Sequence, residues 1–299
     1  MTGPRDLGRV LVTGATGFLG AALVRRLGGA GWQVTASDLG LAERSCDLTN
    51  FAQVESLLGA GGFQTVFHCG AVSGPMVLAD QPLAIWQINA LGTAHVLEAA
   101  RRHGVARVVI CSTCDVYGDL TGVVDETTLP HPVTVYGASK VAAEAVLLGY
   151  VREHNLDAVA LRLAWIYGPG RQTPTSLEAM IRGGMSGTAI SVDAAPDDIT
   201  HYLYIEDAVS GLLCAGQAAT LTERVYNISA GQGIPMRDVV KTILSLAPKA
   251  VITLAGTTTS ALPDVLDNRR ATRDLEFTPI ISLAEGLRLF RDALTGAGR

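Results

Sequence analysis

The sequence predicts an α/β protein in which a parallel β-sheet is covered by helices on both faces, with a smaller α/β lobe after it. Two observations support this fold class. Up to about residue 165, short apolar runs typical of buried strands alternate with stretches of helical periodicity. Beyond that point the pieces become shorter, and loops rich in Gly, Pro, Thr and Asp separate them.

The expected strands of the sheet are the short apolar runs at residues 10–12, 34–38, 65–69, 108–111 and 158–163. Apolar residues at helical spacing predict helices at residues 21–27, 51–58, 92–103 and 135–151. Strands that alternate with helices favour parallel pairing, because each helix carries the chain back across the sheet.

The smaller lobe is expected to hold a helix at residues 177–181, a strand at 189–192 and loops at 182–187, 193–198 and 256–263. A capping box, Ser282-x-x-Glu285, begins a final helix in which Leu283, Leu287 and Phe290 face inward. We place the domains at residues 1–165 and 166–299, and leave open that residues 200–230 return to the first domain.

Composition bounds the function classes. Apolar residues make up 48% of the 299 residues and charged residues 17%, which suits a well-buried core. The net charge of −5 gives no reason to expect nucleic acid or an anionic membrane as a partner. Arg5, Asp6 and Arg9 leave no apolar stretch for a secretory signal before the first strand, so we expect a cytoplasmic protein.

The five cysteines are most simply interpreted as buried thiols of a cytosolic protein. They are Cys46, Cys69, Cys111, Cys114 and Cys214. Cys111 and Cys114 form a CxxC, but no second pair of ligands lies near it in the sequence. We therefore expect neither a metal site nor redox chemistry from this motif.

A glycine-rich loop follows the first strand. Gly14, Gly17 and Gly20 stand three apart, between an apolar run and a helix. One glycine makes the turn, one lets the backbone approach a pyrophosphate and one lets the helix pack on the strand. The helix N-terminus then holds the phosphate charge. The expected dinucleotide-binding residues of the loop are Gly14, Thr16, Gly17, Phe18, Leu19 and Gly20.

The second strand ends in Asp38, at the distance where a ribose-binding carboxylate belongs. A carboxylate hydrogen-bonds a ribose diol but repels a 2′-phosphate. Leu39 and Gly40 follow it instead of an arginine, so the sequence favours NAD over NADP.

Tyr136 and Lys140 are four residues apart, so they lie on one face of a predicted helix. A free tyrosine has a pKa of about 10, too high for a base at neutral pH. The lysine cation and the positive ring of oxidised nicotinamide would both favour the phenolate. Lowering the pKa of Tyr136 by three units takes about 4 kcal/mol, which two cations can supply in a partly dry site. We predict that Tyr136 is a catalytic base.

Together these motifs resemble those of the extended short-chain dehydrogenase/reductases, the NAD-dependent epimerase/dehydratase family, over nearly the whole chain. The matching segments are Thr13 to Gly20 (TGxxGxxG), Asp47-Leu48, His68 to Ala71, Asn89-x-x-Gly92-Thr93, Ser112-Thr113 before Val116-Tyr117-Gly118, Tyr136 to Lys140 (YxxxK), Tyr167 to Gly170 (YGPG) and Tyr204 to Ala208. The resemblance implies a Rossmann-type doubly wound sheet and a cofactor of the NAD type.

The resemblance also implies roles for individual residues. Asp47 and Leu48 would contact adenine, the segment with Cys69, Gly70 and Ala71 would line the cofactor, and Asn89 would support the active-site backbone. Tyr136 would take the proton of a substrate hydroxyl as hydride leaves for the nicotinamide. Thr113 would orient the same oxygen, and Lys140 would hold the nicotinamide ribose. Family members often dimerise through the helices that here cover residues 92–103 and 136–151, so we expect a homodimer.

Two departures from the family pattern bear on the substrate. Nucleotide-sugar enzymes of the family usually carry an Asn where this chain has Ala164. They also commonly carry an Arg in the stretch that corresponds to residues 199–202, and this chain has no Arg there. Arg171, Arg269 or Arg270 could substitute for that Arg. Residues 112–120 resemble the segment STDEVYGDL of sugar 4,6-dehydratases, but Cys114 and Asp115 replace its Asp and Glu. A thiol of pKa about 8.5 is a poor proton donor to a leaving hydroxyl, so dehydration is disfavoured.

We therefore predict an NAD-dependent oxidoreductase that transfers hydride at a secondary alcohol of a sugar, polyol or sugar acid. Nucleotide-sugar epimerisation is the alternative, and 4,6-dehydration is less favoured. A dinucleotide sensor without activity would not need the Tyr, Lys and Thr set. The tentative substrate residues are Ser73, Thr113, Cys114, Arg171, Thr173 and His201.

Overall fold

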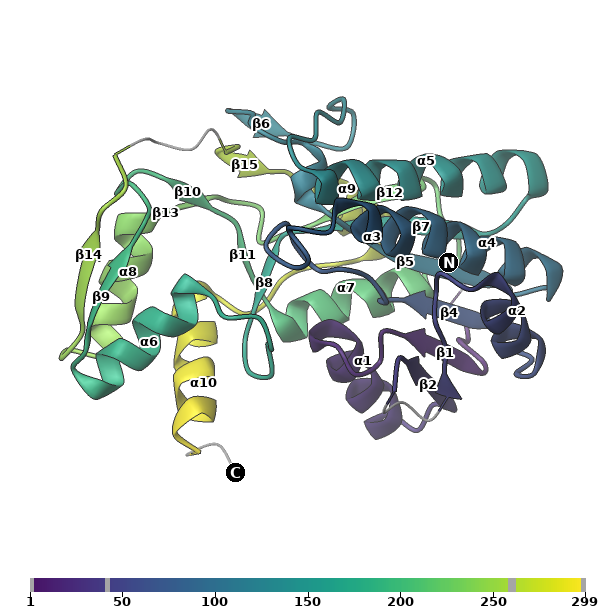
Figure 1. The fold of residues 1–299 in the computed structure, drawn as a ribbon, viewed down its shortest axis with the longest axis horizontal. Coiled ribbons are helices and arrows are strands. Elements are labelled where there is room, and N and C mark those ends of the chain that lie inside the picture. The colour runs from purple at the N-terminus through teal and green to yellow at the C-terminus, as the bar shows by residue number, and fades with distance from the viewer. Residues whose placement is uncertain (1–2, 41–43, 258–261, 297–299) are drawn as a thin grey trace.

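A parallel sheet of seven strands forms the centre of the molecule, in the order β12-β7-β5-β4-β1-β2-β3 (Figure 1). The computed structural model describes residues 3–40, 44–257 and 262–296. The sheet strands are β1 (Val10–Thr13), β2 (Val34–Asp38), β3 (Arg44–Ser45), β4 (Thr65–His68), β5 (Arg107–Thr113), β7 (Ala158–Leu163) and β12 (Val225–Ile228). All neighbouring strands pair in parallel, which confirms the predicted doubly wound α/β class.

The strand order reverses at β1. From β1 the chain proceeds outward to β2 and β3, and then returns to β4 on the other side of β1. It continues outward to β5, β7 and β12. In such sheets ligands bind at the carboxyl ends of the strands beside the reversal, so the fold places a crevice over the ends of β1 and β4.

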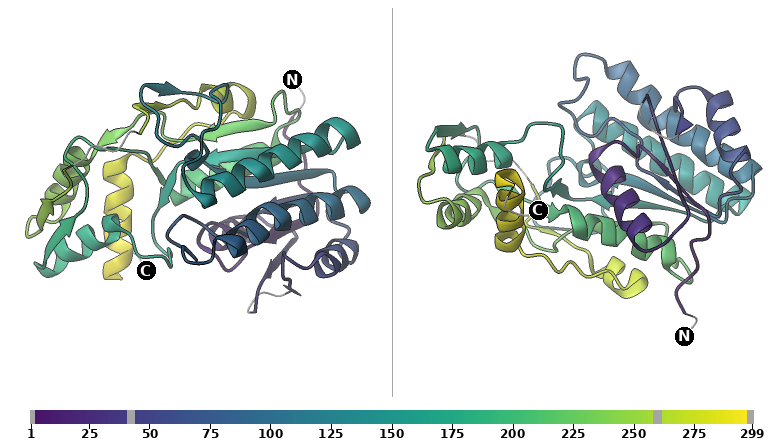
Figure 2. Two further views of the ribbon diagram at one scale, coloured as in Figure 1. Left: turned by 45° about the horizontal axis from the view of Figure 1, so that its top comes forward. Right: turned by 90° about the horizontal axis from the view of Figure 1, so that it is seen from below.

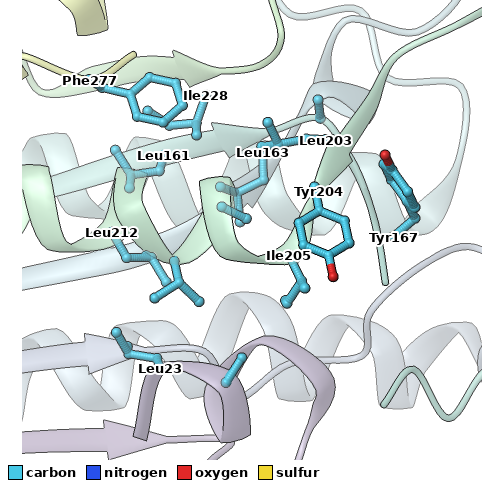
Figure 3. Packing of buried hydrophobic residues seen from close by; sticks show 14 of the residues in the cluster. Leu23, Leu161, Leu163, Tyr167, Leu203, Tyr204, Ile205, Leu212, Ile228 and Phe277 are labelled. Atoms are coloured by element: carbon cyan, nitrogen blue, oxygen red, sulfur yellow. The ribbon is translucent and has the colours of Figure 1, made fainter. Parts of the chain in front are cut away.

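Helices cover both faces of the sheet (Figure 2). One face packs against α1 (Phe18–Gly29), α7 (Ile205–Gln217) and α9 (Arg269–Leu275). The other face packs against α2 (Phe51–Gly59), α4 (Gly92–Arg102) and α5 (Val135–His154). The strands alternate accordingly: Val10 and Val12 belong to the first core and Leu11 to the second. Figure 3 shows Leu23 of α1 and Leu212 of α7 packed beneath Leu161 of β7.

The smaller lobe lies to one side of the sheet (Figure 1). Its helices are α6 (Ser176–Ser186), α8 (Met236–Leu246) and α10 (Leu283–Thr295). Short strand pairs surround them: β8 (Trp165–Tyr167) with β11 (Tyr202–Tyr204), β9 (Ala189–Val192) with β14 (Val251–Leu254), and β10 (Ile199–Thr200) with β13 (Ile234–Pro235). A further pair, β6 (Val123–Val124) with β15 (Val265–Leu266), joins two loops. The Ser282 hydroxyl accepts a hydrogen bond from Glu285 N and caps α10, as predicted.

The chain crosses between the two parts more than once. After entering the lobe at β8 it returns to the sheet through α7 and β12, and then leaves again. The domain limits of 1–165 and 166–299 stay a prediction.

α4 (Gly92–Arg102) confirms the helix predicted at residues 92–103, although α3 (Pro82–Trp86) and a π-helical turn (Gln87–Leu91), which were not predicted, lead into it. One local prediction was wrong. Residues 182–186 were expected in a loop but belong to α6. The glycines at 183 and 184 misled the prediction, because they serve close packing: a Cβ on Gly184 would lie 2.7 Å from the Cβ of Ala247 in the turn after α8. Of the loop predicted at 256–263, residues 258–261 lie outside the described residues.

Candidate active site

A cavity of about 900 Å³ lies over the carboxyl ends of β1, β2, β4, β5 and β7. Its walls come from the glycine loop, the segment after β4, the start of α5 and residues 163–177. Of the predicted site residues, those that line it are Gly14, Gly17, Phe18, Leu19, Gly20, Asp38, Asp47, Leu48, Cys69, Gly70, Ala71, Ser73, Thr113, Tyr136, Lys140, Arg171 and Thr173. The fold thus gathers residues from distant parts of the chain at the crevice.

The glycine loop packs closely against neighbouring backbone, so a side chain does not fit at Gly14 or Gly20. Gly14 has a φ of +65°, and a Cβ there would lie 2.5 Å from Gly70 N. A Cβ on Gly20 would collide with the carbonyl oxygen of Gly14, where α1 passes close to β1. Among the described residues, no side chain caps the first turn of α1. Its N–H groups are therefore available to a phosphate, and these residues fit the pyrophosphate of a dinucleotide.

Asp38 ends β2 at the edge of the cavity. Its Oδ2 accepts hydrogen bonds from Thr16 N at 3.0 Å and Thr16 Oγ1 at 2.6 Å, and its Oδ1 accepts one from Leu39 N at 2.8 Å. Thr16 itself does not line the cavity; it fixes the carboxylate against the loop. This arrangement holds Asp38 where a ribose diol would meet it.

Asn89 lies behind the cavity wall and is fully buried. Its side chain accepts from Val72 N at 2.8 Å and donates to Ser139 Oγ at 3.0 Å. Ser139 in turn donates to the carbonyl oxygen of Tyr136 at 2.7 Å. Asn89 therefore connects the segment after β4 to the first turn of α5, which positions the tyrosine.

Three polar side chains converge on the cavity beside this segment. Tyr136 and Lys140 belong to the first turns of α5, which Thr134 caps by accepting from Gly137 N at 3.0 Å. Thr113 is the last residue of β5. Tyr136 is 8% exposed, Lys140 5% and Thr113 6%, so all three side chains are largely shielded from water. The Thr113 side chain lies close to the Tyr136 phenol.

The effect of Lys140 on the pKa of Tyr136 stays a prediction. Burial raises the pKa of Tyr136 above its ordinary value, and the charge of Asp115 raises it further, while Thr113 acts in the opposite direction. The Lys140 ammonium donates instead to the carbonyl oxygen of Cys111 at 2.9 Å, and burial lowers the pKa of Lys140. A positive nicotinamide ring bound beside the phenol would favour the phenolate.

Asp115 faces the cavity next to Tyr136, although the predicted site did not include it. Burial raises the pKa of its carboxyl. The indole N–H of Trp165 donates to its Oδ1 at 3.4 Å. The alignment of residues 112–120 with STDEVYGDL was the signal that could have placed Asp115 in the site.

Cys114 and His201 were expected to line the substrate pocket, and neither does so in the described structure. The Cys114 sulfur lies 3.8 Å from Asp115 Oδ1, and burial raises the pKa of the Cys114 thiol well above its ordinary value. The His201 ring is hydrogen-bonded to the carbonyl oxygen of Pro263 at 2.6 Å, between β10 and β11. It is 5% exposed, so it serves packing.

Arg171 is a half-buried cation with no carboxylate partner in the described part of the chain. Its Nη1 donates to the carbonyl oxygen of Ile166 at 2.9 Å, and its Cζ lies 5.9 Å from the Phe18 ring centre. Its Nε is buried with no hydrogen-bond partner among the described residues. Burial lowers the pKa of Arg171. An unmet donor on the cavity wall fits an anionic group of a ligand.

A buried ion pair, which was not predicted from the sequence, joins α5 to β7. The guanidinium of Arg162 on β7 binds Glu144 on α5 through two nitrogens, at 3.0 and 2.7 Å. Both side chains are about 5% exposed. Ser112 also donates to Glu144, and Arg162 donates to the Tyr117 hydroxyl at 2.9 Å. Glu144 stands four residues after Lys140, so helical spacing was the available signal.

Fold and site together define a dinucleotide-dependent enzyme of the doubly wound α/β class, with a tyrosine and a lysine on one helix at the cofactor crevice. A family model described as the NAD dependent epimerase/dehydratase family matches residues 10–229. The chain belongs to this family, whose cofactor is NAD.

Individual relatives cover most of the chain. The 2-alkyl-3-oxoalkanoate reductase of Stenotrophomonas maltophilia is 33% identical over 260 residues, covering 79% of this chain and 75% of its own. The UDP-glucose 4-epimerase of Mycolicibacterium smegmatis is 29% identical and covers 93% of this chain and 96% of its own. A UDP-glucose 4-epimerase from Thermus thermophilus, solved in complex with NAD, is 27% identical with a TM-score of 0.85, and covers 97% of this chain and 99% of its own. Helices long and apolar enough to cross a membrane do not occur among the described residues.

Proposed function

We propose that this enzyme oxidises a secondary hydroxyl group of a compact, anionic, sugar-like molecule, with NAD as the hydride acceptor. The observation that carries the proposal is the convergence of Tyr136, Lys140 and Thr113 on the cavity beside the glycine loop. NAD, held by the glycine loop, Asp38, Asp47, Leu48 and residues 69–71, supplies a ring that accepts hydride. Tyr136 takes the hydroxyl proton, Thr113 orients the oxygen, and Lys140 holds the nicotinamide ribose.

A compact substrate is favoured by the extent of the cavity. None of the described lining residues lies in β9, β10, β13, β14 or α8. Tyr202 is the lining residue nearest the C-terminus. Ala164 stands on the wall where nucleotide-sugar enzymes of the family usually carry an Asn. A nucleotide moiety would therefore find few partners there. Arg171 favours a carboxylate or phosphate on the substrate, and Ser73 and Thr173 offer hydroxyl groups to it.

Nucleotide-sugar epimerisation is the second candidate. The similarity to UDP-glucose 4-epimerases over more than nine-tenths of the chain supports it. In that reaction the hydride returns to the opposite face of the substrate, so NAD is regenerated. 4,6-Dehydration is less favoured. Cys114 and Asp115 stand where dehydratases carry their acid and base, and only Asp115 of these two lines the cavity.

Product analysis separates these candidates. The purified enzyme is incubated with NAD and a panel of sugar acids, sugar phosphates, polyols and nucleotide sugars, while NADH absorbance and products are followed. We expect NADH to accumulate with a sugar acid or sugar phosphate. Constant NAD with conversion of a nucleotide sugar to its epimer would contradict the proposal and establish the second candidate.

The variant Arg171→Gln tests whether Arg171 binds an anionic group of the substrate. Hydrogen bonds to a charged group contribute roughly 1.5–3 kcal/mol, so we expect the KM for the anionic substrate to rise about 10- to 100-fold. Arg182 is exposed and paired with Glu178, so Arg182→Gln is the matched control. It should change neither the KM for the substrate nor the Kd for NAD. A weaker Kd for NAD with an unchanged substrate KM would instead assign Arg171 to the cofactor pyrophosphate and contradict the anionic substrate.

We also propose a cytoplasmic homodimer. In the structure α4 and α5 lie side by side (Figure 2), and Leu91, directly before α4, and Leu148 of α5 are each 44% exposed. The described cysteines are all free, as suits a reducing compartment. Sedimentation velocity at micromolar concentration should show a dimer that Leu148→Glu dissociates. A monomeric wild-type enzyme would contradict this proposal.

A further inference from the structure

Two thiols stand side by side on the wall of the cofactor cavity. Cys69 follows β4 directly, and Cys111 lies in β5, which pairs with β4 in the register His68 opposite Ile110. The next residues along both strands are therefore neighbours, and their sulfurs lie 3.7 Å apart. Both side chains are partly exposed, and both line the cavity. The CxxC of Cys111 and Cys114 is not the pair that the fold brings together.

The surroundings of the pair favour reaction at Cys111. A hydrogen bond with Cys69 lowers the pKa of the Cys111 thiol, and the Lys140 charge acts in the same direction against the effect of burial. The other thiols differ: burial raises the pKa of Cys46 to about 11 and also raises that of Cys214. Thiolates, not thiols, are the reactive species, so Cys111 is the best nucleophile among the five cysteines.

We propose that Cys69 and Cys111 form a peroxide-sensitive dithiol, in which oxidation to a disulfide inactivates the enzyme and bound dinucleotide shields the thiols. The Cys111 thiolate attacks a peroxide oxygen, the O–O bond breaks, and the departing oxygen takes a proton to leave as water. Cys111 is then a sulfenic acid. The Cys69 sulfur attacks it, the S–S bond forms, and the S–O oxygen leaves as a second water. The two thiols lose two electrons and two protons, and one peroxide becomes two waters.

The backbone permits this bond. Neighbouring strands lie about 4.8 Å apart, which is within the Cα separation that disulfides span. The sulfurs need only approach each other from 3.7 Å. The new bond changes the position of Cys111, whose carbonyl oxygen holds the Lys140 ammonium at 2.9 Å. Oxidation therefore acts on the group that positions the catalytic lysine.

The experiment uses the reduced full-length enzyme, treated with hydrogen peroxide in the presence or absence of NAD and then blocked with N-ethylmaleimide. Peptide mass spectrometry should identify a Cys69–Cys111 linked peptide that forms as activity is lost, and dithiothreitol should reverse both changes. At a NAD concentration of about 100 times its Kd only about 1% of the enzyme is free, so cross-linking should slow about 100-fold. Cys69→Ser should retain a sulfenic acid at Cys111, detected with dimedone.

Cys214→Ser on α7 is the matched control and should cross-link at the wild-type rate. Loss of activity without the linked peptide, or oxidation of Cys46, Cys114 or Cys214 ahead of Cys111, would overturn the dithiol. The shielding rests on the proposed function, because it needs the nicotinamide half of NAD over these thiols. A linked peptide that forms equally fast with NAD would refute the shielding and the cofactor position, while establishing the dithiol.

Discussion

Replacing Tyr136 by phenylalanine is expected to lower the rate of hydride transfer by about 100- to 10,000-fold, the usual contribution of a positioned general base. The phenol lines the cavity as the proposed acceptor of the substrate proton, and Phe keeps the ring packing while removing the oxygen. NAD affinity should change little, because the glycine loop and Asp38 remain. Steady-state kinetics with the alcohol identified by the substrate panel, together with calorimetric titration of NAD, measures both quantities.

The pH profile of the same pair of enzymes adds an independent readout. Burial raises the pKa of Tyr136, so the phenolate fraction increases as pH rises through the neutral and alkaline range. Wild-type activity should therefore climb with pH, and the residual activity of Tyr136→Phe should not.

Tyr150→Phe is the matched control for this substitution. Tyr150 lies on the same helix, and its hydroxyl donates to Glu98 at 3.1 Å, far along α5 from the cavity. The control should retain wild-type turnover and the wild-type pH profile. Equal activities for Tyr136→Phe and Tyr150→Phe would remove Tyr136 from the proposed reaction.

Replacing Glu144 by alanine is expected to destabilise the fold by about 3–5 kcal/mol, because it leaves the Arg162 guanidinium buried without its counterion. Glu144 and Arg162 hold α5 against β7, and Ser112 and Tyr117 belong to the same hydrogen-bonded group. Urea unfolding followed by circular dichroism measures the free energy of unfolding.

Two further variants test the physical cause. Glu55→Ala removes an exposed partner of Arg102 and should cost at most about 1 kcal/mol. The double variant Glu144→Leu/Arg162→Met removes both buried charges and should recover part of the loss. A loss at Glu144→Ala no larger than that at Glu55→Ala would show that the buried pair does not stabilise α5.

Much of the fold follows from local patterns in the sequence. The strands β1, β4, β5 and β7 are buried on both faces, so they stand out as short apolar runs between helical stretches. The prediction was weaker where packing overrides local preference. Gly183 and Gly184 indicate a loop by composition, yet α6 needs them to approach β9 and α8.

The site was predictable where a motif fixes backbone geometry and less so where neighbours decide. The tight strand-to-helix turn has no room for a side chain at Gly14 or Gly20, so these positions must be glycine and their spacing is visible in the sequence. The pKa of Tyr136 depends on burial and on Asp115, and neither can be obtained from the spacing of Tyr136 and Lys140. Cys69 and Cys111 are 42 residues apart, so only the register of β4 and β5 brings their sulfurs together.

A crystal structure of the enzyme with NAD tests the proposed chemistry most directly. We expect the pyrophosphate at the N-terminus of α1, a ribose diol at Asp38, the second ribose within hydrogen-bonding distance of Lys140 Nζ, and the nicotinamide ring beside the Tyr136 hydroxyl. A nicotinamide ring that lies away from Tyr136, or a dinucleotide bound outside this cavity, would contradict it.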